Sequence, residues 1–386
     1  MNEGVPEGWC RETISCVARL EYGKSPISVK IESGPYPIIG TSGIVGAASE
    51  SLWKDQSVVI GRKGTINKPL FVNQPFWAID TTYFCKFPKT TDPKWFYYKI
   101  VDEGLERYNE ASGVPSLSRE TLNSVSILVP PLPEQKKIAS ILTSVDEVIE
   151  SMQKQIDKLQ DLKKATMNEL LTKGIGHTEF KDSELGRIPK SWEVKKLDDV
   201  TIRGSGHTPD KKNPSYWNGG IKWVSLADSS RLDNRLIGST DKEISDEGLK
   251  NSSAVLHPDG TVILSRDAGV GKSAVLLGAM AVSQHFMAWR CGDKMEKWFL
   301  YYLLQSLKPL FDAVAIGSTI KTIGLGFFKQ MQIVCPPKDE QRRISSILLT
   351  IEDHIDHMKQ KLTQTQSLKK SLMQDLLTGK VRVKVD

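Results

Sequence analysis

The strongest constraint on this chain is an internal duplication. Residues 130–173 and residues 336–379 match at 18 of 44 positions when they are aligned at an offset of 206. A weaker pair joins Val5–Trp9 to Ile188–Trp192 at an offset of 183. Repeats at so long a period indicate duplicated domains rather than a solenoid, whose units run roughly 20 to 50 residues. The chain therefore contains two modules of one plan, and the difference between the offsets gives the second module about 23 additional residues.

Composition narrows the class of protein. The 386 residues, 39% of them hydrophobic and 25% charged, are enough for two or three domains with cores. No stretch reaches the roughly 18 uncharged apolar residues of a membrane span, and residues 1–9 carry acids instead of the basic and apolar parts of a signal peptide. The five cysteines form no Cys-x-x-Cys and are odd in number, which argues against a disulfide framework and a zinc site. We expect a cytoplasmic protein without a membrane partner.

Both repeated segments predict unusually long helices. Residues 134–172 and 340–378 contain neither proline nor glycine, and about 39 helical residues span roughly 58 Å. Their apolar residues recur at heptad spacing, which predicts one stripe along each helix that must pack against a partner. The residues assigned to this seam are Ile138, Ile141, Val145, Met152, Leu159, Leu162, Ile344, Ile347, Ile351, Met358, Leu368 and Leu372.

Duplication suggests how the two helices pack. Because a whole domain lies between them, the simplest arrangement is an antiparallel coiled coil about a pseudo-twofold axis. The polar residues His354 and Lys361 interrupt the stripe and help to set its register. The alternative, in which each helix covers only its own domain, is disfavoured because a small domain cannot bury a stripe of this length.

Upstream of each helix the pattern changes to β-branched and aromatic runs broken by glycine. Ser57–Gly64 and Thr261–Gly269 predict the same strand and turn, and Ile127–Val129 parallels Ile333–Val334 as a last strand. Shorter helices are expected around residues 94–99 and 297–302. Both modules are therefore predicted to be mixed α and β domains.

Several of these segments resemble a known family. Gly34–Gly46, Val59–Gly64 and Phe76–Thr82 in the first module resemble the target recognition domains of type I restriction-modification specificity subunits. Gly206–Pro209 followed by Tyr216–Ser225 is similar to another variant of that domain, and the openings and endings of the long helices resemble the family's spacer regions. The resemblance covers essentially the whole chain.

The resemblance implies an α+β fold in which two mixed α/β target recognition domains are separated by two long antiparallel coiled-coil helices, with a pseudo-twofold internal repeat. The corresponding bounds are 1–133 for the first recognition domain, 134–173 for the first spacer helix, 174–337 for a linker and the second recognition domain, 338–379 for the second spacer helix and 380–386 for a tail.

The resemblance also implies a non-catalytic function without a cofactor. Each recognition domain would read one half of an asymmetric, bipartite site in double-stranded DNA, and the helix pair would set the spacer length. Two methyltransferase subunits and two motor-nuclease subunits would assemble on it. An approximately twofold protein suits half-sites about 34 Å, or one DNA turn, apart, and a net charge of +6 is compatible with DNA although an ordinary surface can carry it.

Basic residues at glycine-rich turns are the candidates for DNA contact, because arginine and lysine reach phosphates and the guanine edge. They are Arg62, Lys63 and Lys68 in the first module and Lys211, Lys212, Lys222, Arg266 and Lys272 in the second. For each of them a solvated surface charge is an equally good interpretation. Trp77, Trp217 and Trp223 are better explained as packing residues than as stacking platforms.

Three motifs could suggest enzymatic activity. Gly269–Ser273 looks like the end of a phosphate-binding loop, but Arg266 stands where that loop needs its first glycine. Asn213–Tyr216 approximates a methyltransferase loop, yet no glycine-rich loop for S-adenosylmethionine accompanies it. His354 and His357 lie one helical turn apart beside two aspartates, which suits seam and flank positions better than a metal site. An autonomous nuclease or methyltransferase, and a coiled-coil scaffold with protein partners only, remain the alternatives.

Overall fold

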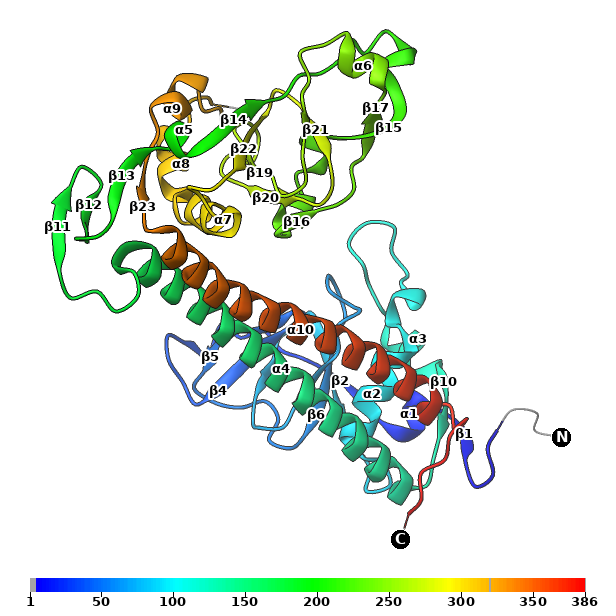
Figure 1. Ribbon diagram of the computed structural model, residues 1–386. Helices are drawn as coiled ribbons and strands as arrows, with labels where there is room; N and C mark the ends of the chain where they lie inside the picture. Colours follow the sequence, from blue (N-terminus) through cyan, green and yellow to red (C-terminus); the bar gives the residue numbers. More distant parts are fainter. Residues whose placement is uncertain (1–4, 319–320, 386) are drawn as a thin grey trace. The chain divides into compact units, whose positions relative to one another are not determined.

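The computed structural model describes residues 5–318 and 321–385, and these form two compact units. Unit 1 contains residues 1–155 and 358–386, and unit 2 contains residues 156–357. Both boundaries fall inside the two long helices, α4 (Leu132–Lys173) and α10 (Lys338–Leu377), which Figure 1 draws in green and red. Each long helix therefore contributes one half to each unit, whereas the predicted bounds treat each helix as a separate segment.

Unit 1 is built on two four-stranded sheets. Their strand orders are β2-β9-β6-β7 and β3-β5-β4-β8, and β1 pairs with β10 in a further two-stranded ladder. The strands are β1 (Cys10–Thr13), β2 (Arg19–Tyr22), β3 (Lys30–Ile31), β4 (Tyr36–Gly40), β5 (Gly43–Ala48), β6 (Ser57–Gly61), β7 (Leu70–Val72), β8 (Trp77–Ala78), β9 (Thr82–Lys86) and β10 (Ser126–Val129). The short helices are α1 (Ile14–Val17), α2 (Pro93–Glu103), the 3-10 helix η1 (Leu105–Tyr108) and α3 (Arg119–Ser124).

Unit 2 repeats this plan with a larger sheet. Its strand orders are β14-β22-β19-β20-β16 and β17-β15-β21-β18, with β11–β12 and β13–β23 as two-stranded ladders. The strands are β11 (Phe180–Ser183), β12 (Gly186–Pro189), β13 (Glu193–Lys196), β14 (Thr201–Ser205), β15 (Trp217–Val224), β16 (Leu236–Ile237), β17 (Lys242–Ile244), β18 (Leu256–His257), β19 (Val262–Ser265), β20 (Ser273–Leu276), β21 (Met280–Val282), β22 (Phe286–Cys291) and β23 (Gln332–Cys335). The helices are α5 (Leu197–Val200), η2 (Pro214–Tyr216), η3 (Leu226–Asp228), η4 (Arg231–Asp233), α6 (Asp246–Lys250), α7 (Lys297–Ser306), α8 (Lys308–Val314) and α9 (Leu325–Gln330).

The additional residues of the second module lie between β14 and β19. β2 and β14 are related by an offset near 183, and β6 and β19 by one near 204. The intervening segment of unit 2 contains α6 and three 3-10 helices, for which unit 1 has no counterpart between β2 and β6. It also adds β16 at the edge of the five-stranded sheet.

The two halves of the helix pair are antiparallel in each unit, as the sequence predicts. In unit 1 the Lys369 ammonium lies 2.6 Å from the carboxylate of Asp146, and the Thr365 hydroxyl contacts the sulfur of Met152. In unit 2 Lys163 lies 2.6 Å from Glu352. The residue numbers rise along one helix as they fall along the other. None of the helices in the described ranges is long and apolar enough to cross a membrane.

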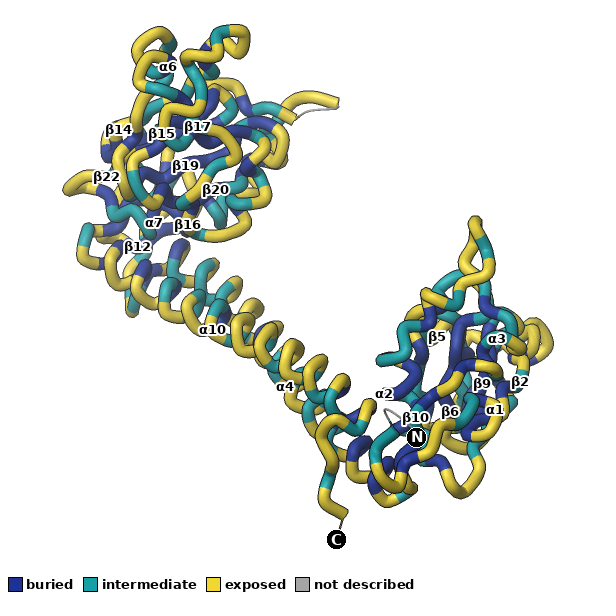
Figure 2. Tube along the Cα trace, turned by 90° about the vertical axis from the view of Figure 1, so that its right-hand side faces the viewer, coloured by how far each residue is buried: buried dark blue, intermediate teal, exposed yellow. Residues whose placement is uncertain are grey.

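The buried seam is narrower than predicted. Leu162, Ile347 and Leu368 are 50%, 40% and 55% exposed, so these three assignments are corrected. Ile156 and Ile355, which the prediction left out, are buried instead. The physical reason is that one partner helix covers a narrow stripe, so residues toward the edge of a wider apolar face stay in water; Figure 2 shows exposed and half-buried residues along both helices. Of the remaining assigned residues, Ile138 and Ile344 are buried and the others half-buried.

A repeated glutamine joins each long helix to the body of its unit. Gln135 is buried; its side-chain oxygen accepts from the Asp92 amide at 2.8 Å, and its nitrogen donates to the carbonyls of Pro130 and Thr90. Asp92 is the N-cap of α2. Gln341 does the same in unit 2: it accepts from the Glu296 amide, the N-cap of α7, and donates to the carbonyls of Pro336 and Lys294. Through these hydrogen bonds each glutamine links the end of a strand, the N-cap of a short helix and the start of a long helix.

A repeated tryptophan and glutamate act at the same end of each long helix, because Glu134 and Glu340 directly precede Gln135 and Gln341. In unit 1 the Trp9 indole donates to the carboxylate of Glu134, which also binds Arg382. In unit 2 the Trp192 indole donates to Glu340, which also binds His177 at 2.7 Å. Arg382 holds the pKa of Glu134 below its usual range, mainly through hydrogen bonding to the carboxylate. The side chain that binds the buried carboxylate therefore differs between the units, whereas the carboxylate is the same.

Candidate DNA interface

Four segments that are far apart in the sequence meet beside the β2-β9-β6-β7 sheet of unit 1 and beside the five-stranded sheet of unit 2. In unit 1 they are residues 22–24, 61–64, 79–82 and 115–119, which we call junction 1. The Arg62 amide donates to the Thr81 carbonyl, the Leu117 amide donates to the Arg62 carbonyl, and the Gly64 amide donates to the Pro115 carbonyl, each at 2.9 Å. Junction 1 thus brings the end of β6, the turn before β9 and the residues that lead into α3 together.

The same backbone connections recur in unit 2. Junction 2 contains residues 205–208, 265–269, 283–285 and 321–325. The Arg266 amide donates to the His285 carbonyl and the Ile323 amide donates to the Arg266 carbonyl, both at 2.9 Å. The Ala268 amide donates to the Lys321 carbonyl at 3.4 Å. Arg62 and Arg266 are therefore structurally equivalent.

In each junction one glycine packs directly against a backbone carbonyl group. A Cβ added at Gly23 would overlap the carbonyl of Ile79, and one added at Gly206 would overlap the carbonyl of Val282. We therefore expect Gly23→Ala and Gly206→Ala to destabilise units 1 and 2, respectively, by about 1 to 3 kcal/mol through overpacking. Urea unfolding measures this. Gly113→Ala is the control, because nothing lies within 4 Å of its added Cβ; equal stability of all three variants would contradict the steric argument.

Junction 1 exposes an aromatic ring between two cations. The guanidinium carbons of Arg62 and Arg119 lie 5.3 and 4.8 Å from the centroid of the Tyr22 ring, and Tyr22 is 44% exposed. Behind it, burial raises the pKa of Tyr83 to about 12, and the neighbouring Tyr22 adds to this shift while the two arginines oppose it. The face of junction 1 is thus cationic and aromatic.

Junction 2 is more self-contained. Arg266 is 16% exposed; its Nε donates to the Ile323 carbonyl at 3.0 Å, and it lies 3.9 Å from the carboxylate of Asp267. The other carboxylate oxygen of Asp267 lies 2.7 Å from Nδ1 of His285. Thr208 donates to Gln284 on the same side. The side chains of junction 2 therefore bind one another to a greater extent than those of junction 1.

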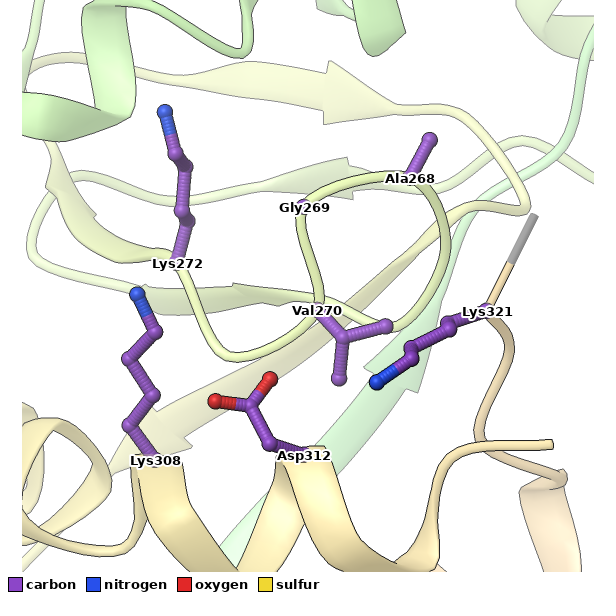
Figure 3. A pocket seen from close by; sticks show the side chains of 7 residues that line it. All are labelled: Ala268, Gly269, Val270, Lys272, Lys308, Asp312 and Lys321. Carbon is purple, nitrogen blue, oxygen red and sulfur yellow. The ribbon is translucent and has the colours of Figure 1, made fainter. Parts of the chain in front are cut away.

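The segment that resembled a phosphate-binding loop is a hairpin turn. Gly269–Ser273 connects β19 to β20, two antiparallel strands, and Ser273 begins a strand rather than a helix. The turn borders an open cavity of about 390 Å³ lined by Ala268, Gly269, Val270, Lys272, Lys308, Asp312 and Lys321 (Figure 3). Lys272 is tied to Asp233 at 2.7 Å and to the Ser229 carbonyl. The backbone lacks the strand-to-helix geometry that holds a triphosphate.

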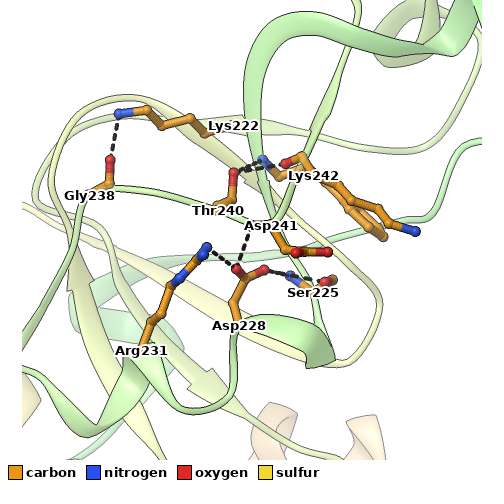
Figure 4. A network of polar contacts seen from close by, with 9 residues as sticks. Lys222, Ser225, Asp228, Arg231, Gly238, Thr240, Asp241 and Lys242 are labelled. Atoms are coloured by element: carbon orange, nitrogen blue, oxygen red, sulfur yellow. Dashed lines mark hydrogen bonds and ion pairs between the residues drawn. The ribbon is translucent and has the colours of Figure 1, made fainter.

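The charged residues of the extended β15–β17 region are largely structural. Asp228 is fully buried and accepts from the Ser225 amide, the Asp241 amide and the Arg231 guanidinium at 2.6 to 2.9 Å (Figure 4). Lys222 donates to the Gly238 carbonyl at 2.5 Å.

In the part of the chain that the structure describes, the two histidines on α10 do not belong to a metal site. Asp353 and Asp356, which flank them, lie 2.5 and 3.6 Å from Arg235. Within residues 5–318 and 321–385, no three His, Cys, Asp or Glu side chains form a metal-binding group.

Comparison with known proteins assigns the chain to a family. The model of the type I restriction modification DNA specificity domain matches residues 6–161 and again residues 189–366. The chain belongs to this family of DNA specificity subunits. The two matched ranges are the two modules that the duplication predicts, and membership of a specificity family agrees with the prediction that the chain is not itself the catalyst.

Individual relatives agree with this assignment. The chain is 26% identical over 419 residues to the type I restriction enzyme MjaVIII specificity subunit of Methanocaldococcus jannaschii, and the match covers 98% of this chain and 94% of the relative. Its fold is similar to the type I system S subunit from M. genitalium, with a TM-score of 0.64, 13% identity and coverage of 98% and 97%. The HsdS subunit from Thermoanaerobacter tengcongensis gives a TM-score of 0.51 at 18% identity, with coverage of 99% and 100%.

The structure separates the predicted DNA-contacting residues of this specificity subunit into two groups. Lys63, Lys68, Lys211 and Lys212 are exposed, and Arg62 is half-buried beside Tyr22. Lys222, Arg266 and Lys272 bind carbonyl or carboxylate groups of their own module. Only Arg62 and Lys63 lie in junction 1 and only Arg266 in junction 2. Trp77 and Trp223 are buried, in agreement with the packing role expected for them.

Sequence reasoning missed two side chains of junction 1 altogether. Tyr22 ends an edge strand and Arg119 begins a six-residue helix, and neither lies in a glycine-rich turn. The available signal was the repeat itself. Aligning the modules puts Ser205 opposite Tyr22 and Leu325 opposite Arg119. The side chains therefore differ at both positions although the surrounding segments are equivalent, and this difference distinguishes module 1 from module 2.

Proposed function

We propose that each module of this specificity subunit reads one half of an asymmetric bipartite target in double-stranded DNA, and that the helix pair sets the spacer between the halves. The observation that carries the proposal is the pair of junctions, which share their backbone connections but not their side chains. Equivalent frameworks with different side chains suit two unlike half-sites. A cytoplasmic location, where the five free cysteines would stay reduced, belongs to the same proposal.

We further propose that methyltransferase subunits, two per chain, dock on the long helices, with two motor-nuclease subunits completing the complex. Equivalent exposed features on the two helices support a repeated docking surface. Leu162 and Leu368 occupy the same position of the repeat and are both about half exposed. The exposed pairs Lys136–Lys137 and Arg342–Arg343 also correspond. Two identical partners fit a surface that occurs twice.

Selection from a random duplex library tests the proposal. We expect the full chain, co-purified with its methyltransferase subunit, to enrich two different short motifs at a fixed separation, because two unequal modules read the DNA. Gly206→Ala should lose the motif read by module 2 and retain the other. An absence of sequence enrichment, or a single uninterrupted motif, would contradict the proposal.

The same preparation distinguishes the alternatives. Methyl transfer from S-adenosylmethionine to DNA by the chain alone would indicate an autonomous enzyme. Stable assembly with the methyltransferase subunit but without retention of duplex DNA would indicate a scaffold.

A further inference from the structure

We propose that Tyr22, Arg62 and Arg119 form a binding site for the DNA phosphodiester backbone that only the first module possesses. This rests on the proposed DNA recognition and adds which surface supplies it. The three residues come from β2, from the loop after β6 and from the start of α3, and only the fold brings them together.

The charge of this site is uncompensated. Among the described residues no carboxylate lies within 4.0 Å of either guanidinium, and the Arg62 guanidinium donates only to the Asp80 carbonyl, at 3.3 Å. Two other arginines beside aromatic rings are neutralised: Arg107, over Tyr108, pairs with Glu103, and Arg382, over Trp9, pairs with Glu134. Arg187, over Phe180, also lacks a carboxylate within 4.0 Å in the described ranges, but no second arginine there shares its ring. Two unpaired guanidinium groups on one surface are suited to an anion such as a phosphate.

Tyr22 gives the site its geometry. The ring lies against Tyr83, with 5.1 Å between centroids, and Tyr22 pairs with that residue in the β2–β9 ladder. Contact with the ring face restricts each guanidinium group by cation–π attraction. Less side-chain freedom is therefore lost when the arginines bind a phosphate.

The second module lacks this arrangement although its backbone is the same. Ser205 precedes Gly206 as Tyr22 precedes Gly23, and Leu325 begins α9 as Arg119 begins α3. Arg266 corresponds to Arg62, but it is 16% exposed and lies 3.9 Å from Asp267. Module 2 therefore has neither the ring nor the second arginine. This phosphate site is therefore specific to module 1.

The test is the salt dependence of DNA binding by the full chain with its methyltransferase subunit. Arg62→Gln and Arg119→Gln should each weaken binding about tenfold at low salt, as expected for a lost charged hydrogen bond. Each should lower the slope of log affinity against log salt by about 0.9, the value for one phosphate contact on duplex DNA. Because a phosphate carries no sequence information, DNA with a scrambled first half-site should lose affinity by the same factor.

Arg107→Gln is the matched control, since it removes an arginine beside a tyrosine in the same unit whose charge Glu103 already compensates. It should leave the slope unchanged. Arg119 is exposed at the first position of α3, so the loss of its charge leaves the fold intact, which thermal unfolding verifies. An unaltered slope in both test variants, with selective binding retained by the wild type, would overturn this site alone. Wild-type protein that does not bind duplex DNA would overturn the proposed function together with it.

Discussion

Removal of one heptad from each long helix is expected to weaken binding to the native DNA target about 100-fold. The deletions are Ile149–Gln155 in α4 and Ile355–Lys361 in α10, at equivalent positions of the repeat. Seven helical residues correspond to about 10.5 Å, or about three base pairs of DNA. If the helix pair sets the spacer, the two modules can no longer contact both half-sites of the native target. The avidity of two linked modules, typically 10² to 10⁴, is then lost.

The deletions remove the Met152–Thr365 contact and the longer of the two Arg235 contacts, that to Asp356, but they leave the ion pairs between the helices intact. The ion pairs Asp146–Lys369 and Lys163–Glu352 lie outside the deleted segments, and a whole heptad preserves the apolar register. Each module should still bind its own half-site with unchanged affinity. Exchanging the two heptads between the helices is the control, because it changes the sequence and keeps both lengths, and it should bind as the wild type does. Affinities are measured for targets with a series of spacers, and wild-type spacer preference in the deletion protein would refute the role of the helices.

Local patterns in the sequence predicted the elements, whereas the site needed the fold. The long helices follow from heptads and from the absence of proline and glycine, and their antiparallel pairing follows from the duplication. The strands expected at residues 57–64 and 127–129 appear as β6 and β10. Each of these depends on neighbours within a few residues. The seam was assigned too broadly because a heptad pattern shows which face is apolar but not how much of it one partner covers, as Leu162 shows.

Local sequence patterns could not predict junction 1. Tyr22, Arg62 and Arg119 lie in three elements that the chain brings together only through the strand order β2-β9-β6 and the short segment before α3. The candidates chosen from glycine-rich turns show the same limitation. Arg62 donates to the Asp80 carbonyl but, among the described residues, has no carboxylate beside it and lies against an exposed ring, whereas Arg266, at the equivalent turn, donates to the Ile323 carbonyl and lies 3.9 Å from Asp267. A turn motif indicates where a charge is placed but not whether its own module already binds it.

The second large effect concerns the repeated glutamines. We expect Gln135→Leu and Gln341→Leu each to lower the free energy of unfolding of their own unit by about 3 kcal/mol or more. Both side chains are almost completely buried and satisfy three backbone groups, and an apolar replacement leaves these groups without partners at a cost of about 1 to 3 kcal/mol each.

Gln160→Leu and Gln366→Leu are the controls: they too occupy equivalent positions of the repeat, but they are exposed, so their effect should stay within about 0.5 kcal/mol. Urea unfolding gives the energies, and hydrogen exchange locates them, with the Asp92 amide losing protection in the first variant and the Glu296 amide in the second. Stability equal to that of the controls would show that these hydrogen bonds do not join the long helices to their units.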